Sequence, residues 1–70
     1  MLRIGNTIRL TEKEREHFRA MTGRPEVPTT VEDYNRAIAV AEKDWQTAES
    51  PEGAFLATMV ADMRLKDDPQ

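Results

Sequence analysis

Apolar and polar residues alternate over positions 2 to 10 of the chain, and Asn6 is the exception. The odd positions from 3 to 9 hold only Arg, Gly and Thr, whereas four of the five even positions from 2 to 10 hold an aliphatic residue: Leu2, Ile4, Ile8 and Leu10. A period of two predicts a β-strand with one apolar face.

The Gly5-Asn6 pair inside this segment is also a signal for a two-residue hairpin turn. Such a turn would place Leu2 opposite Arg9, and residues that lie opposite one another share a face. Each face of the hairpin would then mix aliphatic with polar side chains, which opposes the burial of either face. We therefore predict one unbroken strand, in which Gly5 is a point of close approach to another backbone.

A lone strand leaves its backbone N–H and C=O groups without partners. The rest of the sequence contains no second strand pattern, so the partner is expected from another molecule. The most economical choice is the same strand of a second copy, paired antiparallel about a two-fold axis. The sequence therefore predicts a homodimer.

The first predicted helix begins after Thr11, because the segment TEKE from 11 to 14 is a capping box. It extends to about Thr22, and Gly23 has the position of a C-terminal cap. Residues 24–29 contain two prolines and are predicted to form a loop.

Two further helices follow this loop. Thr30 is the cap of a helix that reaches about Ala48, with a core stripe that includes Tyr34 and Ile38. Ser50 and Pro51 are then typical of the start of a third helix, which is expected to end near Lys66. The predicted fold class is mostly α, with an N-terminal strand, two core helices and an extra C-terminal helix.

The pattern divides the chain into a domain over 1–48, an additional helix over 49–66 that packs on it, and a frayed tail over 67–70. The apolar stripe of the third helix is explained either by packing on the second helix or by binding a partner such as a toxin. The expected dimer core comprises Leu2, Ile4, Ile8, Leu10, Phe18, Tyr34 and Ile38.

Composition narrows the function classes. The 70 residues include no Cys and one His, so disulfides, thiolate metal sites and histidine-rich sites are excluded. No catalytic constellation is visible, and neither a metal nor a cofactor is expected, so an enzyme is not predicted. The sequence has no membrane span and no signal peptide, which favours a cytoplasmic protein.

Charge is unevenly distributed along the chain. Residues 1–24 contain six basic and three acidic residues, for a charge of +3, whereas residues 25–70 contain four basic and ten acidic residues, for a charge of −6. A basic N-terminal third can meet phosphate although the whole chain has a net charge of −3.

The order of strand, helix, loop and helix resembles the ribbon-helix-helix family of DNA-binding proteins. The segment NTIRLTEKEREHFRAMTGR is similar to the ribbon and first helix of that family, and TTVEDYNRAIAVAEK is similar to its second helix. Glu32 and Arg36 stand where the family places an ion pair that is buried in some members, although at i,i+4 they are also explained as a surface pair.

This resemblance implies an intertwined dimer whose antiparallel ribbon lies in the major groove of double-stranded DNA. It implies base contacts from the ribbon and phosphate contacts from the start of the second helix and the loop before it. The base contacts would come from Arg3, Gly5, Thr7 and Arg9, and the phosphate contacts from Thr29, Thr30, Val31 and Arg24.

The sequence thus predicts a homodimeric, sequence-specific DNA-binding protein, a transcriptional repressor or autoregulator of a plasmid, phage or toxin–antitoxin operon. Two alternatives stay open. One is a protein-interaction module, either antitoxin-like or adding a strand to a partner's sheet. The other is an accessory DNA-binding protein of plasmid transfer or partition.

Overall fold

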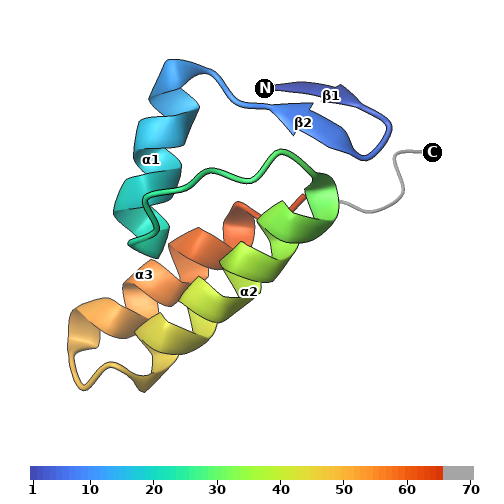
Figure 1. Cartoon of the computed structure of the whole chain (residues 1–70). Helices are drawn as coiled ribbons and strands as arrows, with labels where there is room; N and C mark the ends of the chain where they lie inside the picture. The colour runs from blue at the N-terminus through green and yellow to red at the C-terminus, as the bar shows by residue number, and fades with distance from the viewer. Residues whose placement is uncertain (66–70) are drawn as a thin grey trace.

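The computed structural model describes residues 1–65, which form three helices and a two-stranded antiparallel sheet at the N-terminus (Figure 1). The strands are β1 (Leu2–Ile4) and β2 (Thr7–Arg9), and the helices are α1 (Glu12–Thr22), α2 (Val31–Thr47) and α3 (Pro51–Asp62). The prediction of a mostly helical fold with three helices after an N-terminal β segment is confirmed.

The prediction of one unbroken strand is wrong. The chain turns at Gly5 and Asn6, and β1 pairs with β2 in the register that places Leu2 opposite Arg9. Gly5 has a φ of 59°, whereas Asn6 has no positive φ, and this combination is that of a type II′ turn. A Cβ atom on Gly5 would meet nothing within 4 Å. The glycine is therefore required by the turn and not by close approach of another backbone.

The second edge of β2 is also paired within the chain. The N–H of Ile8 donates to the carbonyl of Thr29 at 2.8 Å, and the N–H of Val31 donates to the carbonyl of Asn6 at 2.8 Å. Thr7 and Thr30 form an antiparallel bridge between these two bonds. The loop before α2 thus supplies backbone partners that the sequence-based prediction had assigned to a second molecule.

Replacing Gly5 with Ala distinguishes the hairpin from an unbroken strand. At a φ of 59° an alanine side chain costs about 1–2 kcal/mol, so the free energy of unfolding should fall. In an unbroken strand the same change would raise it, because glycine weakens strands. Urea unfolding followed by circular dichroism measures the sign. Gly5→Asn is the matched control and should be less destabilising, since Asn tolerates a positive φ better than Ala; a stabilised Gly5→Ala variant would contradict the hairpin.

α1 begins and ends as predicted. The Glu14 carboxylate accepts from the N–H of Thr11 at 2.8 Å while the Thr11 hydroxyl accepts from the N–H of Glu14, which completes the capping box. Gly23 ends the helix in the left-handed conformation. The Thr11 N–H, followed by the N-terminal amine, lowers the pKa of Glu14, so this cap contributes stability at neutral pH that is lost as the pH falls.

α2 and α3 lie antiparallel and side by side (Figure 1). Ser50 caps α3 and Pro51 occupies its first turn, as predicted. The helix ends at Asp62 and not near Lys66, since Met63 and Arg64 bond to the carbonyls of Val60 and Ala61 in a closing turn. The predicted frayed tail lies outside the described residues.

A single core joins the hairpin to all three helices. Its fully buried side chains are Phe18 from α1, Ile38 from α2 and Val60 from α3. The indole N–H of Trp45 donates to the carbonyl of Met21 at 2.9 Å, which ties α2 to the end of α1. α3 therefore contributes to the same core as residues 1–48.

Candidate functional site

The outer face of the hairpin carries two aliphatic and two polar side chains. Leu2 lies opposite Arg9 and Ile4 lies opposite Thr7, and all four residues are exposed. Ile4 is 70% exposed and Leu2 is 56% exposed. We call the surface formed by these four residues the hairpin face. A hollow of about 330 Å³ adjoins it and is lined in addition by Ile8 and Thr29.

The predicted base-contacting residues are divided between two faces. Thr7 and Arg9 lie on the hairpin face, whereas Arg3 lies opposite the buried Ile8 and is only partly exposed. The Arg3 Nε donates to the carbonyl of Gly5 at 3.2 Å and so braces the turn. The expected row of Arg3, Thr7 and Arg9 on one side is therefore not formed within one chain. Because of the two-residue turn, the even positions of β1 and the odd positions of β2 face outward.

Some of the backbone groups predicted to contact phosphate form hydrogen bonds within the chain. The N–H of Val31, the first helical residue of α2, donates to Asn6, and the carbonyl of Thr29 accepts from Ile8. The Thr30 hydroxyl accepts from the N–H of Asp33 at 3.2 Å. The Val31 N–H is thus committed to the hairpin in this chain, and the start of α2 does not present it to a phosphate.

Arg24 belongs to the loop that precedes α2. Arg24 and Thr29 line a common hollow of about 420 Å³, together with Arg36 and Asp33. The Arg36 guanidinium lies 3.1 Å from Glu32 and 3.6 Å from Asp33, and these side chains are largely exposed. The pair of Glu32 and Arg36 is therefore a surface pair. Arg24 and Thr29 thus line one hollow, and Arg36, which was not among the predicted phosphate contacts, lines it as well.

The expected dimer core is divided in the same way as the base contacts. Leu2 and Ile4 are exposed in the single chain, and the other five residues are buried within it. The burial of those five therefore needs no second subunit. The exposure of Leu2 and Ile4 follows from the Gly5-Asn6 turn, so treating that pair as a turn would have found it from the sequence.

Other kinds of site find no support among residues 1–65. No group of three or more His, Cys, Asp or Glu side chains is placed to hold a metal ion in this part of the chain. None of its helices is long and apolar enough to cross a membrane. Comparisons with protein families, curated proteins and solved structures find no match to this chain. The hairpin face and the adjoining loop are therefore assessed on their own chemistry.

Proposed function

We propose that the protein is a homodimeric, sequence-specific DNA-binding protein of the cytoplasm, a repressor or autoregulator of transcription. In this proposal the N-terminal hairpin enters the major groove, which admits a two-stranded β-ribbon. The observation that carries the proposal is the outward placement of Thr7 and Arg9 on an exposed antiparallel ribbon. Arginine can bind guanine through two hydrogen bonds, and Thr7 can contact a thymine methyl group.

The charge distribution supports this proposal. The segment with a charge of +3, residues 1–24, comprises the hairpin and α1. Thr29 lines the hollow beside the hairpin face and also the hollow that contains Arg24. In this proposal Arg24 contacts a DNA phosphate beside the groove-bound ribbon.

A second copy is part of the proposal because the hairpin leaves aliphatic side chains in water. Ile4 and Leu2 are 70% and 56% exposed, and contact with a second hairpin about a two-fold axis would shield part of that area. Two-fold pairing would also present two ribbons to a palindromic DNA site.

The same exposure supports a second candidate function, a protein-interaction module that uses the hairpin face. Large aliphatic side chains at the centre of an exposed face are typical of protein–protein contacts more than of phosphate contacts. In that case Ile4 would insert into an apolar site of a partner and Arg9 would lie at its polar rim.

Replacing Arg9 with Gln tests the DNA-binding proposal. Loss of a bidentate arginine contact should weaken specific binding about tenfold. Fluorescence anisotropy with a duplex selected from a random pool, at two salt concentrations, measures the affinity. Lys43→Gln is the matched control, because it removes one exposed positive charge from α2 and should leave the affinity nearly unchanged.

Three results would contradict the proposal. These are a selection that enriches no duplex, binding that is insensitive to salt, and equal effects of Arg9→Gln and Lys43→Gln on the affinity. The dimer is tested separately by light scattering, with a mass twice the 8.0 kDa of the chain expected. A dimer that Ile4→Asn dissociates, in a protein that selects no DNA, would favour the interaction module.

A further inference from the structure

A third hollow, of about 470 Å³, lies where the N-terminus, α1, α2 and the segment after α3 meet. Four apolar side chains contribute to its lining, two from the N-terminal segment and two from the segment after α3: Met1, Leu10, Met63 and Leu65. A volume of this size is within the range of small-molecule sites, which are mostly apolar with a few polar groups.

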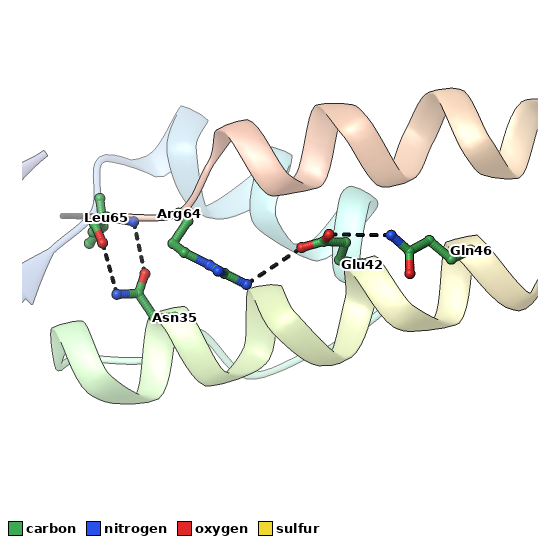
Figure 2. Close-up of polar contacts among 5 residues, drawn as sticks. All are labelled: Asn35, Glu42, Gln46, Arg64 and Leu65. Atoms are coloured by element: carbon green, nitrogen blue, oxygen red, sulfur yellow. Dashed lines mark hydrogen bonds and ion pairs between the residues drawn. The ribbon is translucent and has the colours of Figure 1, made fainter. Parts of the chain in front are cut away.

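The wall formed by the segment after α3 is held in place by α2 (Figure 2). The Asn35 amide donates to the carbonyl of Leu65 at 2.9 Å and accepts from its N–H at 2.8 Å. About two turns further along α2, the Glu42 carboxylate accepts a hydrogen bond from the Arg64 guanidinium at 3.5 Å. Both hydrogen-bonding groups of the Leu65 backbone are thus satisfied by one side chain, which fixes Leu65 at the edge of the hollow.

Tyr34 places a hydroxyl in this hollow. Its side chain is only 6% exposed and its ring packs on Phe18, with the ring centres 5.3 Å apart. Among residues 1–65 the Tyr34 hydroxyl forms no hydrogen bond. In the same residues, every side-chain oxygen that is fully buried has a hydrogen-bond partner. The Tyr34 hydroxyl therefore reaches solvent through the hollow that its side chain lines, where it can donate to a ligand.

The charged groups at the rim of the hollow are the Lys13 side chain, the Glu14 carboxylate and the N-terminal amine that pairs with Glu14. Lys13 and His17, one turn apart on α1, contribute to the lining, as does Glu14. The Glu14 carboxylate lies 3.0 Å from the N-terminal amine and accepts from the N–H of Thr11, so its charge is already paired. The charge of Lys13 is left to attract an anion.

We propose that this hollow binds a small carboxylate with an aliphatic or aromatic body. The body would lie against the four apolar walls, and the carboxylate would accept a hydrogen bond from Tyr34 and lie near Lys13. This site is independent of the proposed DNA contact, since it shares no residue with the hairpin face.

Octanoate is a suitable probe, titrated into the full ¹⁵N-labelled chain and followed by amide chemical shifts. Saturable shifts are expected at Lys13, Tyr34 and Leu65 and not at the hairpin face. Tyr34→Phe should weaken octanoate about fivefold, the equivalent of one hydrogen bond. Lys13→Gln should weaken it about threefold, whereas the matched control Lys43→Gln should leave it unchanged.

Octylammonium and octanol test the choice of head group, and both should bind more weakly than octanoate. The proposal is overturned if octanoate causes no saturable shift at the hollow, or if the three probes bind equally well. It is also overturned if Lys13→Gln and Lys43→Gln are alike. Thermal unfolding of Tyr34→Phe, expected to resemble that of the parent chain, shows that a lost affinity does not reflect a lost fold.

Discussion

Replacing Phe18 with Ala should leave the chain largely unfolded at 25 °C. Phe18 is fully buried and packs against Tyr34, so it joins α1 to α2. Truncation of a buried phenylalanine typically costs about 3–5 kcal/mol, and a core of this size rarely supplies more than about 3–5 kcal/mol in total. Far-ultraviolet circular dichroism should show loss of most of the helical signal.

Phe55→Ala is the matched control for this prediction. The chemical change is the same, but Phe55 is 66% exposed on α3, so the free energy of unfolding should change by less than about 0.5 kcal/mol. Equal destabilisation by the two variants would mean that Phe18 does not occupy the centre of the core.

Replacing Gly53 with Ala should also destabilise the fold strongly, although alanine is the better helix former. A Cβ atom on Gly53 would lie 2.5 Å from the carbonyl oxygen of Trp45 and 3.1 Å from the Cβ of Ala48. The carbonyl belongs to the last turn of α2 and cannot rotate away, so α3 would have to move. Such overpacking costs about 1–3 kcal/mol, and urea unfolding should show it as a lower midpoint.

Ala54→Gly separates this clash from helix propensity. Ala54 is the next residue of α3 and is exposed, so glycine there should cost about 1 kcal/mol through propensity alone. Propensity by itself predicts opposite signs for Gly53→Ala and Ala54→Gly. The structure predicts that both variants are less stable, and a stabilised Gly53→Ala would contradict the close contact of α3 with α2.

The helices could be predicted from the sequence because their signals are local. Thr11, Thr30 and Ser50 each accept a hydrogen bond in the first turn of the helix that follows, and Gly23 ends α1 with a positive φ. Such caps depend on four or five neighbouring residues and not on the rest of the fold. The end of α3 lacked a signal of this kind, and its predicted boundary was accordingly four residues too late.

The hairpin could not be predicted with the same rule because its stability is not local. One unbroken strand would place all the aliphatic side chains on one face, and this argument decided the prediction because the sequence shows no partner strand for β2. The bonds from Ile8 to Thr29 and from Val31 to Asn6 span more than twenty residues. They satisfy the second edge of β2, so the hairpin forms although its outer face mixes Ile4 with Thr7.

For the candidate sites, too, some features follow from local sequence and others only from the tertiary structure. The sequence by itself determined three capped helices and a basic N-terminal third, because residue type and spacing are sufficient for these. Only the tertiary structure decided that Arg3 and Arg9 lie on opposite faces of the hairpin and that Tyr34 opens into a hollow walled by Leu65. Those relations depend on turn parity and on contacts between segments distant in the chain, which no local pattern contains.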